Sequence, residues 1–264
     1  MDKMSSAQQQ YLHLQDRHKK TVTAWRIALI VMFLVLWEVT AEAELINSFI
    51  FSSPSQILTT AWQMMKDGTL WLHLGITLGE TLVSFAAVTI LGLLTAILLW
   101  LFPTLSEILE PYLVMLNSLP KSALAPLLIV WLGNNIRTVM VAAVSVAIFG
   151  SILTLHTGFR EMDEDKIKLI YSLGGTKKDV MYKVILPGSL PMLVSNMKVN
   201  IGLCLVGVII GEFLSAKAGL GYLIIYASQT FKMDWMLMSI VILCLVSTML
   251  YQGVHLLEKK FGNG

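Results

Sequence analysis

The chain has 264 residues, of which 56% are hydrophobic and 14% charged, and its formal net charge is +2. Ordinary soluble domains carry roughly 25% charged residues, so this composition argues against a water-soluble globular protein. The small net charge argues against nucleic-acid binding. The two cysteines, Cys204 and Cys244, both lie in apolar stretches and do not indicate a disulfide framework. A bilayer core needs ~20 apolar residues per helix, so this length allows around six spans and predicts an all-α polytopic membrane protein.

The N-terminal part predicts one span preceded by a cytoplasmic segment. Residues 1–25 are polar and basic, and the apolar run after them begins late and lacks a small-residue cleavage site, which favours a retained helix over a signal peptide. This first span begins near Ile27. The stretch over residues 52–70 is too short and polar to cross a bilayer and is predicted to be an outer interfacial helix with Pro54 in its first turn. Residues 26–70 thus hold the first span and this interfacial helix.

Five further apolar segments predict a core of five spans within residues 71–257, and residues 258–264 are predicted to be a polar cytoplasmic tail. The third and fifth of the six spans each contain one lysine, Lys121 and Lys198. The five core spans are predicted over residues 81–102, 111–136, 138–159, 186–211 and 235–257.

The distribution of basic residues predicts that both termini lie in the cytoplasm. With that orientation, 13 of the 19 lysine and arginine residues fall in cytoplasmic segments, four fall in outer loops and two lie within spans. An excess of Lys and Arg in cytoplasmic loops usually accompanies the orientation of membrane proteins. Glu80 and Glu110 are predicted to lie at the membrane interfaces.

The cytoplasmic loop over residues 160–187 begins with the pattern of a short amphipathic helix. Acidic residues from Glu161 to Asp165 crowd its start, where negative charge complements the helix dipole. Ile167, Ile170 and Tyr171, with Leu169 and Leu173 beside them, are predicted to form one apolar face. Gly174-Gly175 is predicted to end the helix, because glycine readily takes the left-handed conformation of a C-terminal cap.

A second short helix is predicted after this glycine corner. Thr176 with Asp179 three residues later reads as a capping box. Leu186-Pro187 is predicted to terminate the helix before the next span, since proline lacks an amide hydrogen. Periodicity alone leaves two interpretations open. The two helices form either a lid lying on lipid headgroups, with their lysines attracted to anionic lipid, or a rigid knob on which a soluble partner docks.

The spacing in this loop resembles the cytoplasmic signature of binding-protein-dependent ABC importer permeases. That signature reads Glu-Ala-Ala, three residues, Gly, nine residues, Ile, one residue, Leu-Pro, and Gly174, Val184 and Leu186-Pro187 stand at the matching positions. Lys168, Leu169 and Ile170 replace the Glu-Ala-Ala, and Val184 replaces the isoleucine.

Two further motifs are similar to the taurine, aliphatic sulfonate and nitrate branch of this family, so the resemblance runs from about residue 81 to the C-terminus. One is Pro111, Leu119-Pro120-Lys121, Ala123, Ala125-Pro126-Leu127 and Trp131-Leu132-Gly133 in the third span. The other is Gly211-Glu212 followed by Gly219-Leu220-Gly221-Tyr222-Leu223-Ile224.

The resemblance implies a type I ABC importer permease in the bacterial inner membrane. Its partners would be a cytoplasmic ABC ATPase dimer, a second copy of the permease and an extracytoplasmic substrate-binding protein. ATP would be bound and hydrolysed by the ATPase, because this chain lacks the Gly-x-x-x-x-Gly-Lys-[Ser/Thr] loop, so no cofactor is expected in it. The residues expected to couple to the ATPase are Lys168, Leu169, Ile170, Gly174, Gly175, Val184, Leu186 and Pro187.

Five residues are candidates for the translocation pathway. Pro120 and Pro126 are expected to break the third span, which membrane proteins tolerate where the freed carbonyls line a cavity or are covered by protein. Lys121 and Lys198 are either contacts for an anionic substrate or snorkelling lysines near an interface. Glu212 belongs either to an outer gate or to a capped turn. The cargo suggested by the branch is a small anion such as a sulfonate, taurine, nitrate or bicarbonate.

The rival functions are a secondary transporter or channel, and an intramembrane enzyme. The first often shows inverted repeats with paired broken helices, and no convincing internal symmetry is visible. The second would need a carboxylate pair, a His-Glu-x-x-His or a nucleophile motif within the spans, and the sequence contains none. Its five histidines form no His-x-x-x-His pair either, so neither a catalytic nor a metal site is predicted.

Overall fold

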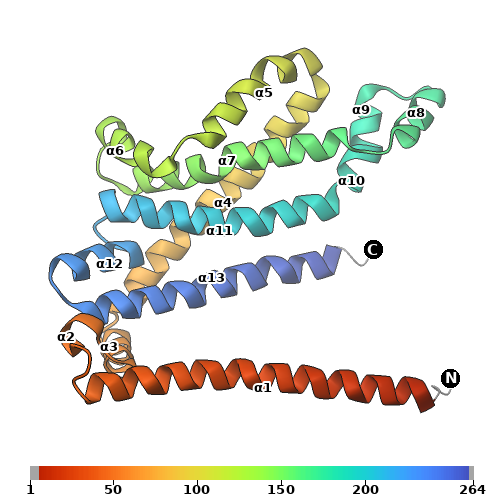
Figure 1. Cartoon of the computed structure of the whole chain (residues 1–264). Helices are drawn as coiled ribbons and strands as arrows, with labels where there is room; N and C mark the ends of the chain where they lie inside the picture. The colour runs from red at the N-terminus through yellow and green to blue at the C-terminus, as the bar shows by residue number, and fades with distance from the viewer. Residues whose placement is uncertain (1–5, 262–264) are drawn as a thin grey trace.

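The computed structural model describes residues 6–261, and helices make up most of this part of the chain (Figure 1). The elements are α1 (Ser6–Glu42), α2 (Ser48–Phe51), α3 (Pro54–Lys66), α4 (Thr69–Leu101), α5 (Pro103–Ser118), α6 (Lys121–Leu132), α7 (Ile136–Arg160), α8 (Glu164–Ser172), α9 (Lys177–Val180), the π-helical turn η1 (Met181–Ile185), α10 (Leu186–Gly188), α11 (Leu190–Ser215), α12 (Leu220–Gln229) and α13 (Met233–Phe261).

The prediction of an all-α membrane protein with about six spans is confirmed. Among the described residues, α1, α4, α7, α11 and α13 are long and apolar enough to cross a membrane. A sixth crossing is reached if α5 and α6 are counted as one broken span. The predicted boundaries at residues 1–25 and 258–264 fall partly outside the described residues.

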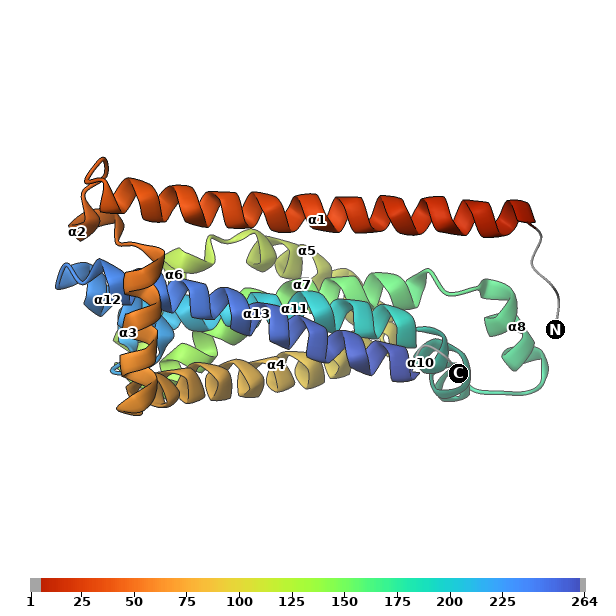
Figure 2. The ribbon, with the colours of Figure 1, turned by 90° about the horizontal axis from the view of Figure 1, so that it is seen from below.

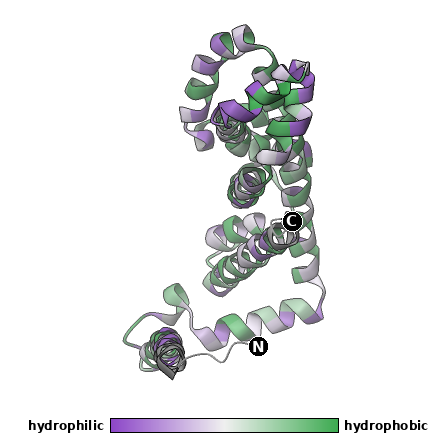
Figure 3. Ribbon diagram, turned by 90° about the vertical axis from the view of Figure 1, so that its right-hand side faces the viewer, coloured by the Kyte–Doolittle hydropathy of each residue, from purple (hydrophilic) through white to green (hydrophobic). Residues whose placement is uncertain are grey.

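The long helices run side by side, so that the molecule has two distinct ends (Figures 1 and 2). One end carries the beginning of α1, the end of α13 and the loop with α8, α9 and α10; we call it the loop end. The other carries α2, α3, α6 and α12, and we call it the opposite end. The spanning part of α1, residues 17–42, lies at the edge of the bundle and is not buried against it. Figure 3 views the molecule from the loop end and shows green apolar residues alternating with purple polar ones on the helices.

Glycines on α11 allow its backbone to approach α7 closely. A Cβ atom on Gly207 would lie 2.6 Å from the Cα of Ala143, and one on Gly211 would lie 2.8 Å from the Cα of Val139. Because lipid tails are as apolar as leucine, helices in a membrane associate mainly through such close packing and through polar contacts. This interface forms the centre of the bundle.

A buried polar cluster connects the same helices nearer the middle of α7. The side-chain amides of Asn196 and Asn200 donate to the Ser151 hydroxyl at 2.8 and 2.9 Å. Gly92 on α4 faces the same hydroxyl, at 2.9 Å from the position of its absent Cβ. These contacts fix α11, α7 and α4 in register, because each buried amide would otherwise lose a hydrogen-bond acceptor in an apolar medium.

The predicted third span over residues 111–136 is a pair of helices, α5 and α6, and the break expected at Pro120 is present. The chain breaks at Leu119-Pro120, where Leu119 is extended, and the helices over residues 103–118 and 123–132 are bent by 103° from one another. A residue before proline is pushed out of the helical region by the proline ring, which explains the position of the break. The helix break predicted at Pro126 is absent, because α6 continues past this residue.

The interfacial helix and the second span also differ from prediction. The former ends at Lys66, and Gly68, with φ of +80°, turns the chain into α4. The second span begins at Thr69 instead of residue 81, and the polar side chains in its first turns, such as Thr77 and Glu80, are buried against the bundle. Glu80 was predicted to lie at a membrane interface, and the structure buries it against the bundle instead.

The close packing of α11 on α7 gives a testable stability difference between two glycines of one helix. Gly207→Ala forces a Cβ onto the backbone of Ala143, so we expect a loss of roughly 1–3 kcal/mol in the free energy of unfolding. Gly202→Ala is the matched control, since nothing lies within 4 Å of its Cβ position. Denaturant titration in mixed micelles measures both, and equal stabilities of the two variants would contradict this packing.

Candidate functional site

The loop between α7 and α11 contains the short helix that its sequence predicts. Asp163 caps α8 by accepting a hydrogen bond from the Asp165 amide at 2.9 Å. Glu164 and Asp165 occupy the first turn, where their charge is favourable beside the helix N-terminus. Ile167 and Ile170 pack towards the membrane helices. The predicted helix start is therefore confirmed, and the predicted apolar face is confirmed for these two isoleucines but is wrong for Tyr171, which is 47% exposed.

Both glycines at the predicted corner are needed, for different reasons. Gly174 has φ of +80°, and its amide donates to the Tyr171 carbonyl at 3.0 Å. Gly175 donates to the Ile170 carbonyl at 2.9 Å, and a Cβ on it would lie 2.8 Å from that oxygen. Gly174 is required by conformation and Gly175 by space. The prediction that this pair ends the helix is confirmed.

The capping box of the second helix is also confirmed. The Asp179 carboxylate accepts from the Thr176 hydroxyl at 2.6 Å and from the Thr176 amide at 2.8 Å, and the Asp179 amide donates back to the hydroxyl. The hydrogen bonds from Thr176, aided by nearby Lys183, hold the pKa of Asp179 below its ordinary value. These contacts fix the direction in which the chain leaves the glycine corner.

The prediction that Leu186-Pro187 terminates this helix is wrong. The helical path runs through Leu186-Pro187, from α9 through the π-helical turn η1 to the end of α10 at Gly188, and one turn residue, Ser189, then separates α10 from α11. The Leu186 amide donates five residues back to Met181, and the Ser189 amide donates to Ile185. Proline lacks an amide hydrogen and its ring needs room on the preceding turn, and the wider π turn before Pro187 provides for both. The loop is therefore joined to α11 through one turn residue.

A buried apolar cluster anchors the loop on the ends of α4 and α7. Its fully buried members are Ala96, Leu155, Phe159, Val180, Met181 and Ile185. Ile170, Val184 and Leu186, all predicted coupling residues, pack against this cluster. Because it contains residues of α4, α7, α9 and η1, the loop cannot shift without moving the helices beneath it.

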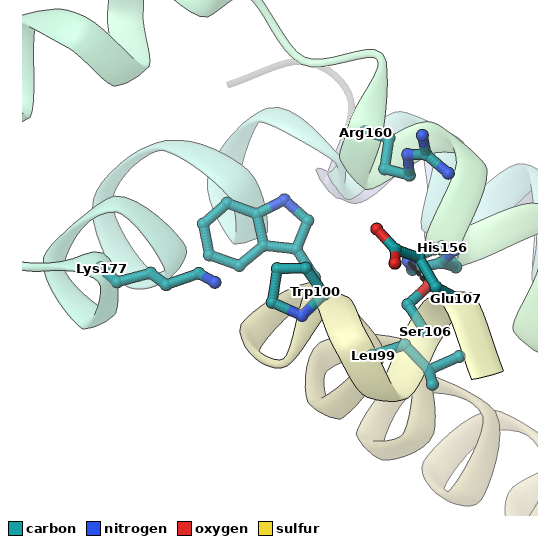
Figure 4. A pocket seen from close by; sticks show the side chains of 8 residues that line it. Leu99, Trp100, Ser106, Glu107, His156, Arg160 and Lys177 are labelled. Atoms are coloured by element: carbon teal, nitrogen blue, oxygen red, sulfur yellow. Dashed lines mark hydrogen bonds between the residues drawn. The ribbon is translucent and has the colours of Figure 1, made fainter. Parts of the chain in front are cut away.

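Lys177 adds a polar connection to the same anchor. Its ammonium donates to the Leu101 carbonyl at 2.7 Å, at the C-terminus of α4, and lies 5.4 Å from the centre of the Trp100 ring. A cation at a helix C-terminus is favoured by the helix dipole. Figure 4 shows Lys177 and Trp100 at the edge of a cavity of about 290 Å³. On the other side of this cavity, the His156 ring and the Ser106 hydroxyl form a hydrogen bond of 3.0 Å.

The outer face of α8 exposes apolar side chains. Leu173 is 75% exposed and Leu169, one helical turn earlier, is 57% exposed, and Tyr171 is 47% exposed. Lys168, which stands where the resembled signature has glutamate, pairs with Glu164 of its own helix at 3.0 Å. We call Leu169, Tyr171 and Leu173 the apolar tip of the loop.

The predicted pathway residues do not form one cluster. The oxygen of the Asn117 side chain lies 3.3 Å from the Cβ position of Gly150, so the break at Pro120 sits near the middle of α7. The Lys121 ammonium donates to the Asn117 carbonyl. Lys198 follows Asn196, which bonds Ser151, so both lysines lie near the same depth.

Glu212 lies about 21 Å from Lys198 along α11, since the two are fourteen residues apart at 1.5 Å per residue. It is 1% exposed and accepts from the Thr77 hydroxyl and the Gly221 amide, both at 2.6 Å. Gly219 approaches so closely that a Cβ on it would lie 2.2 Å from a Glu212 carboxylate oxygen. Glu212 thus clamps the start of α12 onto α4.

Sequence reasoning missed the partners of Glu212 on α4. His73 accepts from the Gly219 amide at 2.9 Å, and the Thr77 hydroxyl accepts from the Leu220 amide at 2.8 Å. Glu80 lies one turn further along α4 and is buried beside Glu212. The signal was present in the sequence: polar residues recur at three- and four-residue spacing from His73 to Ser84 in an otherwise apolar helix.

Residues 88–262 match the family described as "Binding-protein-dependent transport system inner membrane component". Among curated relatives, the taurine transport system permease protein TauC of Escherichia coli is 27% identical over 240 residues, which cover 89% of this chain and 87% of TauC. The putative aliphatic sulfonates transport permease protein SsuC of E. coli is 26% identical, with 87% of each chain covered. The bicarbonate transport system permease protein CmpB of Synechocystis is 23% identical and covers 89% of this chain and 87% of its own.

The fold is similar to that of the membrane chain in the inward-facing MetNI methionine ABC transporter. The TM-score is 0.65 at 18% identity, and the match covers 73% of this chain and 97% of that chain. This likeness confirms the predicted architecture.

Replacing Gly174 at the glycine corner is expected to strain the backbone without causing a steric clash. Nothing lies within 4 Å of a Cβ on Gly174, so Gly174→Ala pays only for left-handed backbone, about 1–2 kcal/mol. We expect amide hydrogen exchange in the peptide over residues 170–180 to accelerate roughly 5–30-fold. Gly174→Asn is the control and should show a smaller acceleration, because asparagine tolerates this conformation better. Exchange of the alanine variant at the wild-type rate would contradict the assignment.

The capping box predicts a pH dependence of fixed sign. Because the pKa of Asp179 is lower in the folded loop than in the unfolded chain, its ionisation stabilises the loop above the unfolded pKa, and this contribution is lost as the pH falls through the folded pKa. Carbon NMR of labelled aspartate should show a titration midpoint below the ordinary value. Thr176→Ala should raise that midpoint, and an unchanged midpoint in this variant would contradict the stated cause.

Proposed function

The chain belongs to the family of binding-protein-dependent transport system inner membrane components, and on this premise we propose that it is the permease subunit through which an ATP-driven importer moves a small anionic solute into the cytoplasm. Family membership supports the permease role directly. The family description also supports a separate solute-binding protein on the outer side. The solute, the ATPase and the orientation are argued below from the residues.

The loop end is proposed to face the cytoplasm. It collects the basic residues of the first helix, residues 17–26, together with Lys166, Lys177 and Lys178 of the loop. The opposite end is poor in lysine and arginine. An excess of basic residues usually marks the cytoplasmic side of a membrane protein, and this asymmetry supports a cytoplasmic position for both termini.

The observation that carries the proposal is an exposed apolar tip on a loop that is fixed rigidly to the bundle. Leu169, Tyr171 and Leu173 project from α8, while the helices behind them are locked into the cluster around Phe159. A soluble partner that buries this tip gains apolar contact area, and its movement is transmitted through η1 to α11. This supports docking of a cytoplasmic ATPase dimer over a lid that merely rests on lipid.

The proposed cargo class rests on the relatives and on two lysines. TauC, SsuC and CmpB are named for taurine, aliphatic sulfonates and bicarbonate. Lys121 and Lys198 lie near mid-membrane, where a lysine is costly unless it serves a polar path or finds a partner. The helix break at Pro120 frees backbone groups at the same depth, which suits a polar passage. Pro126 lies within α6, after this helix break in the sequence.

A second copy of the permease is proposed to complete the path. One bundle of six spans encloses too little wall for a gated passage. The spanning part of α1 has its apolar side chains unburied, from Trp25 to Val39, so a second bundle or lipid must cover them. A secondary transporter or channel without an ATPase is the alternative function, and the following experiment separates the two.

A charge placed on the apolar tip should remove the ATPase. We expect Leu173→Asp to lower co-purification of an ATPase from native membranes at least roughly tenfold, because burying an unpaired carboxylate costs several kcal/mol. Leu45→Asp is the matched control, since Leu45 is 76% exposed and Leu173 75%, at opposite ends of the molecule. It should retain the ATPase. Failure to recover an ATPase with the wild-type chain would favour the alternative.

A further inference from the structure

Two buried glutamates lie side by side at the opposite end of the bundle, where α4 meets the start of α12. Glu80 of α4 is 4% exposed and Glu212 of α11 is 1% exposed. Their carboxyl groups form a hydrogen bond with each other. Ionised carboxylates only accept hydrogen bonds, so this contact requires a proton on one of the two groups. The pair therefore holds one proton between two carboxyl groups.

The surroundings of Glu212 favour its ionised form. Apart from Glu80, the groups in hydrogen-bond contact with Glu212 among the described residues are all donors. The Thr77 hydroxyl and the Gly221 amide donate to its two oxygens, both at 2.6 Å, and the Tyr222 amide donates as well. The two amides belong to the first turn of α12, where the helix dipole stabilises negative charge. The proton of the pair is therefore held by Glu80, which donates to Glu212.

The surroundings of Glu80 fit a neutral carboxyl group. Its Oε2 atom is buried and has no hydrogen-bond partner among the described residues. An ionised carboxylate is far more costly to bury than a neutral carboxyl group, and a second charge beside Glu212 would add repulsion. In the neutral acid, Oε2 is a carbonyl oxygen and carries much less charge. A proton on the other oxygen therefore accounts for the contacts of Glu80.

This proton contributes to the attachment of α12 to α4. Glu212 holds the start of α12, and Glu80 holds Glu212 to α4. The amides of Gly219 and Leu220 add two hydrogen bonds from the same segment to side chains of α4, at 2.9 and 2.8 Å. Loss of the proton would remove the bond between the two carboxyl groups and leave two adjacent carboxylates, which repel each other.

Three further titratable groups face this region. His73 accepts from the Gly219 amide through Nδ1 at 2.9 Å, so its protonation at that atom would weaken the contact on acidification, which is opposite in sign to the effect of Glu80. Tyr222 stacks on the His73 ring, with centroids 6.0 Å apart. Lys217 is exposed and lines, together with Glu80, a cavity of about 290 Å³, whose α7 residues are uncharged.

We propose that Glu80 binds a proton that locks the start of α12 onto α4, and that release of this proton at alkaline pH loosens the opposite end of the bundle. The stabilisation by the proton is present at low pH and is lost as the pH rises past the point at which Glu80 ionises. The cavity beside Glu80 provides the route for proton exchange. The use of this lock as a pH-dependent outer gate of an importer rests on the proposed function, whereas the proton site itself does not.

Infrared spectroscopy of the full chain in lipid nanodiscs detects the proton directly, because a protonated carboxyl group has a C=O band separate from the bands of carboxylates. We expect this band in the wild type at neutral pH, its disappearance at alkaline pH and its absence in Glu80→Gln. Glu42→Gln is the matched control and should keep the band, since Glu42 is exposed in the last turn of α1, at the same end of the molecule.

Hydrogen exchange of the amides over residues 219–222 measures the lock itself. Glu80→Gln keeps the shape, and its side-chain amide donates to Glu212 at every pH. In the wild type we expect protection factors, which correct for the intrinsic pH dependence of exchange, to fall roughly 10–100-fold from neutral to alkaline pH, as for loss of a hydrogen bond to a charged group. In Glu80→Gln they should stay constant. His73, Tyr222 and Lys217 are present in both proteins, so the difference isolates Glu80.

Three results would overturn the proton lock. The first is a wild-type spectrum without a carboxylic acid band that disappears at alkaline pH, and this measurement needs no variant to fold. The second is an acid band that persists unchanged in Glu80→Gln. The third is protection over residues 219–222 that responds to pH equally in the wild type and Glu80→Gln, or in neither. Both measurements use the chain without an ATPase, so failure here is distinguishable from failure of the proposed function, which ATPase recovery tests.

Discussion

The apolar cluster around Phe159 is the contact on which the function of this molecule depends. It joins Ala96 of α4 and Leu155 of α7 to Val180 and Ile185 of the loop, all of them buried. Protein interiors are densely packed and resist compression, so a push on the loop is passed to the bundle instead of being absorbed at the joint. The hydrogen bond from Lys177 to the last turn of α4 and the short connection from η1 through α10 to α11 act in the same direction.

The sequence was sufficient to predict this loop because its structure is set by local chemistry. The capping box of Thr176 and Asp179 and the corner at Gly174 require only neighbouring residues, and each has a distinctive pattern. The effect of Pro187 was predicted wrongly because it is not set by neighbouring residues alone. Whether a proline ends a helix or is accommodated by a π turn depends on what the flanking residues pack against, and Ile185 is fixed in the cluster around Phe159.

The opposite end was harder to predict because its contacts join distant parts of the chain. Thr77 and Glu212 are 135 residues apart and meet at 2.6 Å, and no local pattern announces that pairing. Glu80 was therefore assigned to an interface, although it is buried beside Glu212. The break at Pro120 was predicted correctly and the break at Pro126 wrongly, because the two prolines look alike in sequence, yet only the first coincides with a change of direction. The assignments of Lys121 and Lys198 to the pathway stay predictions.

The apolar tip is expected to be buried against an ATPase in the native membrane. One crosslinking measurement tests this expectation most directly. Cys204 and Cys244 are replaced by alanine, and a single cysteine at position 173 is labelled with a photoreactive maleimide in intact membranes. We expect the labelled cysteine to form one major adduct, with a polypeptide that carries a Gly-x-x-x-x-Gly-Lys-[Ser/Thr] loop. Adducts with lipid alone at position 173, in membranes where an ATPase still co-purifies with the chain, would contradict it.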